Sequence, residues 1–412
     1  MQDLANKNIL LGICGSIAAY KAAILIRELR HAGALVKVVM TTVATQFITP
    51  LTMQALSGNE VRTDLLDTSA EQAMNHIELT RWADYFIIAP ASANCLSKLA
   101  HGYADDLLST LYLVNRNPVL VCPAMNSCMW THPATQNNCT ILRQHGVLIL
   151  APQTGLQACG EYGAGCLPDS ILIINTLRLM TIKNLMSGQN IMITAGATRE
   201  PIDAVRFISN LSSGKMGYAL AMAAYIAGAN VTVISGTTND IPPILDGITV
   251  NTVQSAQDMY EQVKQQWQEQ MIFIGCAAVA DFCINKPAAT KIKKHLHENL
   301  SLNLQKTQDI LAYISNLSNA KYIIGFAAEV SDLIVNAKEK LHKKHIDMII
   351  ANPVGINLGF EQDHNQAIVI TKTQEIPLEK MHKITMAKEI IKILAEQLNI
   401  GTCFGHVPNH FL

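Results

Sequence analysis

The chain has 412 residues, of which 49% are apolar and 15% are charged, and its formal net charge is −1. This length predicts two domains, and the apolar content excludes an intrinsically disordered chain. The near-neutral charge argues against a general binder of nucleic acids or membrane surfaces. No apolar stretch is long enough to cross a bilayer, and no secretory signal is visible. The ten cysteines include no C-x-x-C pair, which favours reduced thiols in a cytoplasm over disulfides or a zinc site.

The first half of the chain alternates short apolar runs with helical patterns. Strands are predicted at 9–14, 35–41, 85–90 and 118–123, and helices at 17–33 and 134–146. Continuous apolar strands that alternate with helices are typical of a parallel sheet covered on both faces. We therefore predict a doubly wound α/β domain.

Three motifs of this half carry candidate chemistry. In CGSIAAYK, Gly15 and Ser16 lie between a strand and a helix, where free N–H groups suit a phosphate, although the motif is not the G-x-G-x-x-G fingerprint. The stretch LVCPAMNSCMWT crowds Cys, Met and Trp around Asn126 at a strand end. Cys159 lies in the glycine-rich QACGEYGAGC, which favours a reactive thiol over a core one. His76 stands alone in MNHIEL, where a structural role is the usual alternative.

The pattern restarts in the second half. NIMITAG at 190–196 and IAGANVTVISG at 226–236 echo the first strand and the first helix–strand junction, with a joint near 183–189. We predict domains at 1–187 and 188–412, both doubly wound. The polar segment 197–217 is longer than its counterpart in the first half and follows the first strand, where ligands of such sheets bind. It is therefore predicted to hold substrate rather than to be a surface loop without a role.

Two basic groups stand out in the second half. KIKKHLH at 291–297 is one, and Lys338, Lys340, Lys343 and Lys344, which follow GFAAE, are the other. Either could be a solvated charged face, but in a neutral chain the two favour a nucleoside triphosphate over nucleic acid. SSGKMG is no P-loop, because Met216 stands where Ser or Thr is required.

Together these motifs resemble a known family. GSIAAYK, NHIEL, APASAN, PAMNSCMW, ACGEYGAG, TREPIDAVRFISNLSSGKMG, GCAAVADF, KIKK and GFAAE occur in the order found in the bacterial bifunctional enzymes of coenzyme A synthesis. In that family a phosphopantothenoylcysteine decarboxylase is fused to a phosphopantothenate–cysteine ligase. The resemblance spans roughly residues 5–398 and implies a flavodoxin-like flavoprotein domain followed by a Rossmann-like domain.

The resemblance implies an FMN-dependent decarboxylase in the first domain. FMN would oxidise the thiol-bearing carbon of the substrate, so that CO₂ can leave, and would then return the hydride. Asn126 would hold the substrate carboxylate, His76 would assist at the flavin, and Cys159 would give a proton to the ene-thiolate. The implied FMN contacts are Gly15, Ser16, Ile17, Thr41, Thr42, Val43, Ser92, Ala93, Asn94, Cys95 and Ala124.

The resemblance implies a CTP-dependent ligase in the second domain. CTP, with Mg²⁺, would activate 4′-phosphopantothenate as an acyl-cytidylate, which L-cysteine then attacks. Lys291 would stabilise the first half-reaction and Asn210 the second, and no metal ligands are implied. The implied nucleotide contacts are Gly275, Cys276, Ala277, Asp281, Lys291, Gln308, Asp309, Ile310, Leu311, Phe326, Lys340 and Lys344.

The resemblance also predicts how the chain assembles, and four positions differ from the usual family motifs. The family implies a cytoplasmic homo-oligomer, a trimer-based dodecamer, that acts on small molecules and binds neither nucleic acid nor membrane. Four positions depart from its usual motifs. They are Cys166 in the loop 157–167, which in the family closes over the substrate, Asp105 near the flavin, Gln308 in a segment whose backbone is expected to be less constrained, and Pro353 in place of a carboxylate. Two alternatives remain, a decarboxylase of peptide C-terminal cysteines and a regulatory flavoprotein without activity.

Overall fold

The structure is a computed structural model. It describes residues 4–65, 75–182, 184–238, 245, 247–293, 300–317, 319–329, 332–354 and 362–400, apart from the side chains of Asn75 and His76. The chain divides into two compact units, unit 1 at Met1–Arg178 and unit 2 at Leu179–Leu412. Each unit is described by itself below.

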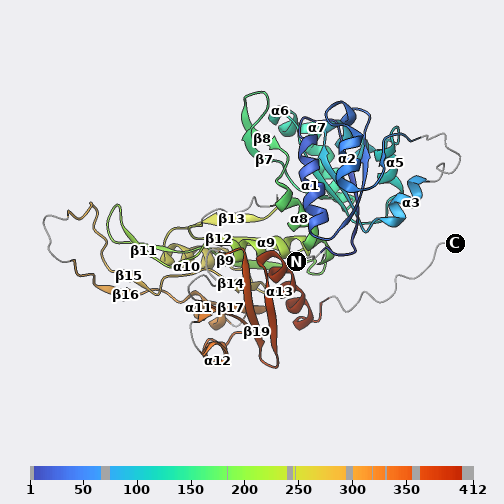
Figure 1. The fold of residues 1–412 in the computed structure, drawn as a ribbon. Helices are drawn as coiled ribbons and strands as arrows, with labels where there is room; N and C mark the ends of the chain where they lie inside the picture. The colour runs from blue at the N-terminus through green and yellow to red at the C-terminus, as the bar shows by residue number, and fades with distance from the viewer. Residues whose placement is uncertain are drawn as a thin grey trace. The chain divides into compact units, whose positions relative to one another are not determined.

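Unit 1 consists of a parallel sheet, its helices and a separate hairpin (Figure 1). The sheet strands are β1 Asn8–Ile13, β2 Leu35–Met40, β3 Val61–Arg62, β4 Tyr85–Ala91, β5 Val119–Pro123 and β6 Leu148–Ile149, and the hairpin is β7 Gln153–Leu156 with β8 Tyr162–Cys166. The helices are α1 Ala19–His31, η1 Ala44–Gln46, α2 Pro50–Ser57, α3 Asn75–Trp82, α4 Ala93–His101, α5 Leu107–Val114, α6 Ser127–Thr131, α7 Pro133–Gln144 and α8 Ser170–Leu179.

The unit 1 sheet has the order β3-β2-β1-β4-β5-β6 with every pairing parallel. Its central strands are fully buried because they are apolar on both faces, as in Phe86, Ile87 and Ile88 of β4. The helix α1 buries Ala22, Leu25 and related positions at helical spacing. This strand order is that of dinucleotide-binding folds. The predicted flavodoxin-like fold is therefore confirmed for the layers of sheet and helices but not for the order of the strands.

Unit 2 contains a larger sheet and two short strand pairs. Its strands are β9 Asn190–Ala195, β10 Arg199–Pro201, β11 Phe207–Ser209, β12 Asn230–Ser235, β13 Thr249–Thr252, β14 Ile272–Gly275, β15 Phe282–Ile284, β16 Leu304–Lys306, β17 Tyr322–Glu329, β18 Met348–Pro353, β19 His364–Thr371 and β20 Glu375–His382. Its helices are η2 Met180–Ile182, α9 Lys215–Ile226, α10 Ala256–Gln266, α11 Ile310–Asn316, α12 Leu333–Lys343 and α13 Lys383–Gln397.

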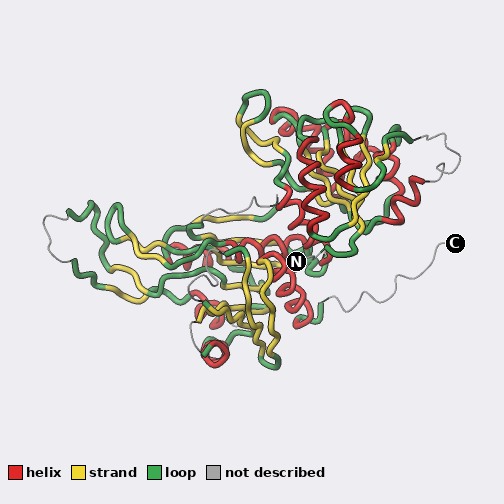
Figure 2. The backbone as a smooth tube through the Cα atoms, viewed as in Figure 1, coloured by secondary structure: helices red, strands yellow, loops and turns green. Residues whose placement is uncertain are grey.

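The unit 2 sheet has the order β13-β12-β9-β14-β17-β18-β19-β20. The strands from β13 to β18 pair in parallel, in the same relative order as in unit 1, which confirms the repeated doubly wound pattern. The sequence did not predict the two antiparallel strands β19 and β20 at the edge. They are visible beside α13 in Figures 1 and 2.

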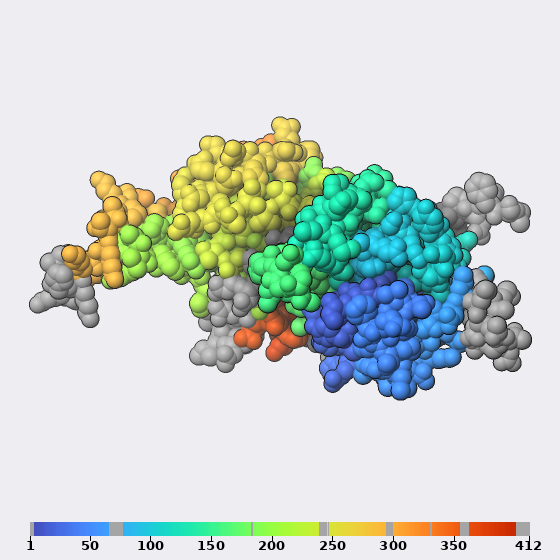
Figure 3. Space-filling view, turned by 90° about the horizontal axis from the view of Figure 1, so that it is seen from above, coloured from blue at the N-terminus to red at the C-terminus, as the bar shows by residue number. Residues whose placement is uncertain are grey.

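The polar segment 197–217 is a hairpin rather than an irregular loop. Its strands β10 and β11 pair antiparallel, with Arg199 opposite Ser209, before α9 begins at Lys215. The pair β15–β16 lies beside this hairpin, and both extend from the sheet of unit 2 (Figures 1 and 3). The predicted substrate-holding segment therefore has regular structure of its own.

Candidate active sites

A hollow of about 450 Å³ opens in unit 1 at the carboxyl ends of β1, β2 and β4. In an open parallel sheet this edge is the usual place for a ligand. Most of the predicted FMN contacts line the hollow, namely Gly15, Thr41, Thr42, Val43, Ser92, Ala93, Asn94 and Cys95. Ser16, Ile17 and Ala124 are not among its lining residues.

Local sequence explains the shape of this hollow. A Cβ atom on Gly15 would lie 2.3 Å from Cγ1 of Val43, so only glycine lets the turn after β1 approach the turn after β2 so closely. Ser92 accepts a hydrogen bond of 3.2 Å from the Cys95 N–H and so begins α4. The Ser16 hydroxyl accepts from the Ala18 N–H at 3.2 Å, which orders the start of the first helix. Free N–H groups at these helix starts suit an anionic group.

Lys98 joins two carboxylates in the wall of the hollow. Its Nζ lies 2.8 Å from Oδ1 of Asp105 and 2.8 Å from Oδ2 of Asp106. Desolvation opposes the charged forms of both Lys98 and Asp106. The hydrogen bonds that Lys98 donates to Asp105 and Asp106 nevertheless raise the pKa of Lys98, and the bonds that Asp106 accepts from Lys98 and Ser109 lower the pKa of Asp106. The sequence indicated the extra carboxylate of Asp105 but not the lysine that neutralises it.

Asn126 and Cys159 are brought together. The side-chain Oδ1 of Asn126 accepts from the Cys128 N–H at 2.9 Å, which makes Asn126 the N-cap of α6 and points its Nδ2 outward. That Nδ2 lies 3.5 Å from Sγ of Cys159, 2.9 Å from Oε2 of Glu161 and 3.3 Å from Oε1 of Gln157. Met129 of the same helix lines the hollow.

Sequence reasoning missed Gln157 and Glu161. Their contacts with Asn126 join positions up to 35 residues apart, which no local pattern encodes. The alternation of Gln157, Cys159 and Glu161 around a tight turn is the one signal that could have pointed to a shared direction. The side chain of the predicted catalytic His76 lies outside the described residues, although its backbone belongs to α3.

The hairpin β7–β8 is fixed against the segment that carries Asn126. The Met125 N–H donates to the Gly165 carbonyl at 3.1 Å. A Cβ atom on Gly165 would lie 2.1 Å from the Met125 carbonyl oxygen, and one on Gly163 would lie 2.8 Å from Cβ of Ser127. Glycines are therefore required for this close approach. The departure at Cys166 places its thiol 3.7 Å from the Leu156 carbonyl, inside the hairpin.

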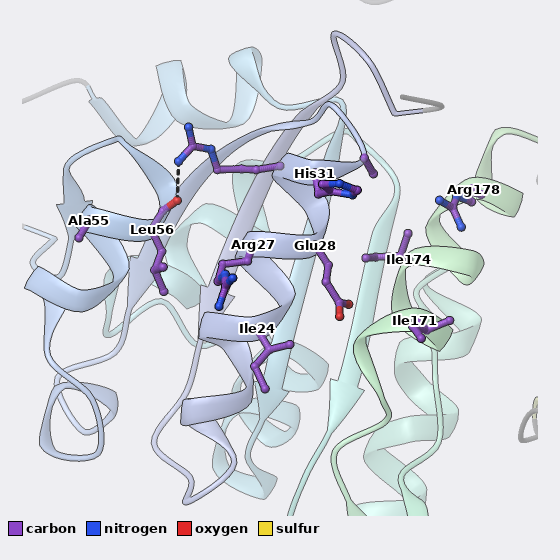
Figure 4. A pocket seen from close by; sticks show the side chains of 11 residues that line it. Ile24, Arg27, Glu28, His31, Ala55, Leu56, Ile171, Ile174 and Arg178 are labelled. Carbon is purple, nitrogen blue, oxygen red and sulfur yellow. Dashed lines mark hydrogen bonds between the residues drawn. The ribbon is translucent and has the colours of Figure 1, made fainter. Parts of the chain in front are cut away.

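A larger hollow of about 900 Å³ lies elsewhere in unit 1, between α1, α2 and α8 (Figure 4). Arg27, Glu28 and His31 of α1 face it, and Arg178 comes from α8. The Arg30 guanidinium donates to the Leu56 carbonyl at 2.7 Å. None of the predicted site residues lines this hollow.

In unit 2, contacts link many of the predicted nucleotide residues. Lys340 donates to the Phe326 carbonyl at 2.9 Å, and burial lowers the pKa of Lys340 although Glu329 and Asp281 oppose this shift. Lys344 pairs with Asp309, which caps α11 through the Ala312 N–H. A Cβ atom on Gly275 would lie 2.9 Å from Leu311. Gly275 ends β14 in register with Thr194 of β9, and the next two N–H groups donate to Thr194, that of Cys276 to its carbonyl at 3.2 Å and that of Ala277 to its hydroxyl at 3.3 Å.

The segment around Gln308 is anchored, in contrast to the expectation of a less constrained backbone. The Thr307 hydroxyl donates to the Ala280 carbonyl at 2.6 Å, and the Thr307 N–H donates to the Asp281 carbonyl at 3.0 Å. Pro353 ends β18 in register with Glu329, and the next N–H, of Val354, donates to the Glu329 carbonyl. The proline therefore costs this pairing no donor.

Asn210 and Lys291 are held separately. Asn210 donates from Nδ2 to the Val279 carbonyl at 3.0 Å, and Lys291 is exposed. The buried Asp203 carboxylate accepts from the Ile292 N–H at 3.1 Å and from the Arg206 guanidinium at 3.0 Å. Desolvation raises the pKa of Asp203, but bonds from the Ile292, Val205 and Arg206 N–H groups outweigh it and hold that pKa below its ordinary value. Asp203 therefore fixes the main chain next to Lys291.

The residues that the structure describes contain neither a cluster of metal-ligating side chains nor a membrane-spanning helix. In that part of the chain no three or more His, Cys, Asp or Glu side chains gather as a metal site would require. No helix there is long and apolar enough to span a bilayer.

Comparison with known proteins shows to which family the chain belongs. The flavoprotein family model matches residues 1–181, and the model of the DNA/pantothenate metabolism flavoprotein C-terminal domain matches residues 186–398. The coenzyme A biosynthesis bifunctional protein CoaBC of Vibrio vulnificus (strain CMCP6) is 44% identical over 409 residues, which cover 98% of this chain and 100% of that protein. The chain belongs to this family of bifunctional coenzyme A biosynthesis proteins.

A second curated relative also matches most of the chain. CoaBC of Escherichia coli (strain K12) is 46% identical over 369 residues, covering 88% of this chain and 90% of that protein. The crystal structure of the C-terminal domain of a CoaBC protein is 37% identical and covers 53% of this chain and 99% of that domain, with a TM-score of 0.45. The two family models and the full-length curated relatives confirm the resemblance inferred from the motifs, and the chain is a bifunctional enzyme of coenzyme A biosynthesis with a flavoprotein half. The boundary at 187/188 stays a prediction.

Proposed function

We propose that the chain performs two consecutive steps of coenzyme A synthesis. Unit 2 joins 4′-phosphopantothenate to L-cysteine with CTP, which gives CMP and pyrophosphate. Unit 1 then decarboxylates 4′-phosphopantothenoyl-L-cysteine to 4′-phosphopantetheine with FMN. Membership of the family supports the pair of activities, whereas a lone peptide-cysteine decarboxylase would leave the match of residues 186–398 without a role.

The observation that carries the decarboxylase is the meeting of Asn126 and Cys159, with Nδ2 and Sγ 3.5 Å apart, where Asn126 begins the helix whose Met129 lines the hollow. The hollow fits FMN, because its glycine cradle and helix starts suit a phosphate and its volume is that of a small-molecule site. When bound, FMN supplies the oxidation of the thiol-bearing carbon and the later return of the hydride. Gly15 and Thr41 would hold it on one side, and Ser92 and Asn94 on another.

The chain's own residues orient the substrate and move one proton. The Asn126 amide, with its oxygen engaged by the Cys128 N–H, presents donors to the substrate carboxylate. Cys159, exposed at the turn of the hairpin, gives its proton to the ene-thiolate that remains after CO₂ leaves. The hairpin excludes water while this intermediate exists. His76 assists at the flavin by family resemblance.

Replacement of the thiol tests this assignment. Cys159→Ser should still release CO₂ and reduce the flavin, but should not form 4′-phosphopantetheine, because the hydroxyl is a much weaker acid. Stopped-flow absorption and mass spectrometry of quenched reactions would follow both events. A product rate equal to that of the parent protein would overturn the role of Cys159, and a protein that binds no FMN would overturn the decarboxylase.

The ligase is supported by the cluster at the carboxyl ends of β14 and β17. It places the cations of Lys340 and Lys344 beside Phe326 and Asp309, where a nucleotide of the predicted kind would lie. Mg²⁺ would bind mainly through the triphosphate, since such ions keep waters and take few protein ligands. Charge on the departing pyrophosphate would be balanced by Lys291.

Pyrophosphate release tests the ligase. With CTP and 4′-phosphopantothenate but no cysteine, the protein should release one pyrophosphate per site and retain the acyl-cytidylate. Removal of Mg²⁺ with a chelator should stop this step. Release that requires cysteine, or that occurs without 4′-phosphopantothenate, would contradict the proposed order.

Location and assembly complete the proposal. We place the enzyme in the cytoplasm as a trimer-based dodecamer, following the family resemblance. Light scattering coupled to size exclusion measures the mass of the particle directly, and a stable monomer would contradict this assembly.

A further inference from the structure

Glu161 occupies a position in unit 1 that the proposed reaction does not yet use. Its Oε2 accepts a hydrogen bond of 2.9 Å from Nδ2 of Asn126 and lies 3.7 Å from Sγ of Cys159. The turn that carries it is closed by two backbone bonds, from the Gln157 N–H to the Glu161 carbonyl and from the Gly160 N–H to the Gln157 carbonyl. This turn directs Gln157, Cys159 and Glu161 toward the same amide.

The orientation of that amide is fixed independently of Glu161. Because Oδ1 of Asn126 accepts from the Cys128 N–H at 2.9 Å, its Nδ2 must point toward the hairpin. Glu161 therefore meets a donor on Asn126 and the S–H donor of Cys159 at one carboxylate oxygen. A carboxylate is the acceptor that such a pair of donors favours.

The proposed reaction creates a need at Cys159. Each turnover removes the proton from its thiol, and the thiolate must regain one before the next substrate reacts. Three side chains among the described residues lie within hydrogen-bond reach of Sγ, those of Asn126, Gln157 and Glu161. The first two are amides, so Glu161 is the one that can take up and release a proton. Glu161 is also exposed, so it can exchange that proton with water.

We propose that Glu161 positions the Asn126 amide and relays protons from solvent to Cys159. The relay rests on the decarboxylase proposed for unit 1. In each turnover the S–H bond of Cys159 breaks as a C–H bond forms on the substrate-derived ene-thiolate. The Glu161 carboxylate then takes a proton from solvent and passes it to the thiolate, which restores the thiol of Cys159 and the carboxylate of Glu161. No electrons are transferred in these steps, so they need no further reactant.

The relay predicts a burst. Cys159 starts each experiment protonated, so Glu161→Gln should complete the first turnover and form one 4′-phosphopantetheine per site. Later turnovers should be slower than in the parent protein by about 10², the usual contribution of a positioned acid or base. Rapid-quench measurement of product over several turnovers would resolve the two phases. Glu60→Gln, an equal charge change on the exposed partner of Arg62, is the matched control and should show no burst.

Rescue separates a relay from a purely structural role. Glu161→Ala leaves space for a small carboxylic acid, so added acetate should raise its slow phase several-fold and should leave the parent protein unaffected. Glu161→Asp should retain part of the steady rate. FMN absorption of each variant shows that unit 1 is folded.

Each result decides the proposal. A burst with acetate rescue supports it. A Glu161→Gln variant as fast as the parent protein overturns it, and so does a variant with FMN bound that loses the first turnover and is not rescued, because Glu161 would then only hold the hairpin. If the parent protein itself releases no CO₂ from 4′-phosphopantothenoylcysteine, the decarboxylase assignment fails and the relay with it.

Discussion

The two candidate sites are held together in different ways. In unit 1 the groups meet side chain to side chain, with Asn126, Cys159 and Glu161 in one cluster. In unit 2 the two predicted catalytic positions are tied through main chain instead, Asn210 through the Val279 carbonyl and the Lys291 segment through the bond from the Ile292 N–H to Asp203. The first arrangement lets one hairpin assemble several reacting groups at once. The second holds the groups for the two half-reactions at separate places on the main chain. A substitution at one place should therefore disable one half-reaction and leave the other intact.

The largest effects should come from the two separately held groups of unit 2. Lys291→Gln should slow pyrophosphate release by about 10²–10³, since it removes a cation where charge builds. Asn210→Asp should still form the acyl-cytidylate but pass it poorly to cysteine, so that this intermediate accumulates. Mass spectrometry of reactions quenched with and without cysteine distinguishes the two. If both variants stop at the same step, the assignment of Lys291 to the first half-reaction and of Asn210 to the second is wrong.

Asp203 tests the idea of a main-chain anchor. Asp203→Ala should leave the Ile292 N–H without its acceptor and leave the Arg206 guanidinium only its bond to the Ile292 carbonyl, so the Lys291 segment should lose its fixed position. We expect pyrophosphate release to fall by about 10², because misplaced groups lose most of their orientation advantage. Decarboxylation of added 4′-phosphopantothenoylcysteine should be unchanged. Glu379→Gln, on an exposed position of β20, is the control, and an equal loss in both variants would contradict the anchor.

The hairpin of unit 1 can be displaced by a single methyl group. Gly165→Ala would place Cβ 2.1 Å from the Met125 carbonyl, whereas Gly155→Ala in the same hairpin would meet only the Cys166 thiol at an ordinary 3.5 Å. We expect the first to lower the decarboxylation rate about tenfold or more and the second to leave it unchanged. Assays of CO₂ release and of pyrophosphate release on the same samples check that unit 2 is unaffected. Similar rates for the two alanine variants would show that the hairpin does not position Cys159.

The sequence predicted much of this arrangement because its signals are local. Apolar runs located the strands after which Gly15 and Ser92 follow, whereas Gly275 was indicated only by a family motif. The contacts of Glu161 and Asp203 were not predicted, because they join positions 35 and 89 residues apart. Such pairs depend on how the hairpins dock, and a one-dimensional pattern does not encode docking. The antiparallel strands at the edge of unit 2 were missed for a related reason, since their pairing partner β18 already belongs to the parallel pattern.

The smallest effect concerns the charge cluster of unit 1. Lys98→Met leaves Asp105 and Asp106 without their cation, whereas Lys98→Arg keeps it. The folded pKa of Asp106 is lowered, so its stabilising effect is present above its ordinary value of 3.8 and is lost as pH falls through the folded pKa. The folded pKa of Lys98 is raised, so its effect is present below 10.5 and is lost at higher pH.

The ion pairs of Lys98 with Asp105 and Asp106 are partly exposed. We therefore expect Lys98→Met to lower the free energy of unfolding by about 1 kcal/mol between pH 5 and 9, as is usual for such ion pairs. That corresponds to a melting temperature about 2–4 °C lower for a unit of this size. The difference should shrink at about pH 3, where the carboxylates protonate in both proteins. Thermal unfolding of unit 1 followed by flavin fluorescence measures this. An offset as large at pH 3 as at pH 7 would mean that the methionine perturbs packing in the wall of the hollow, and the cluster would not act through its charge.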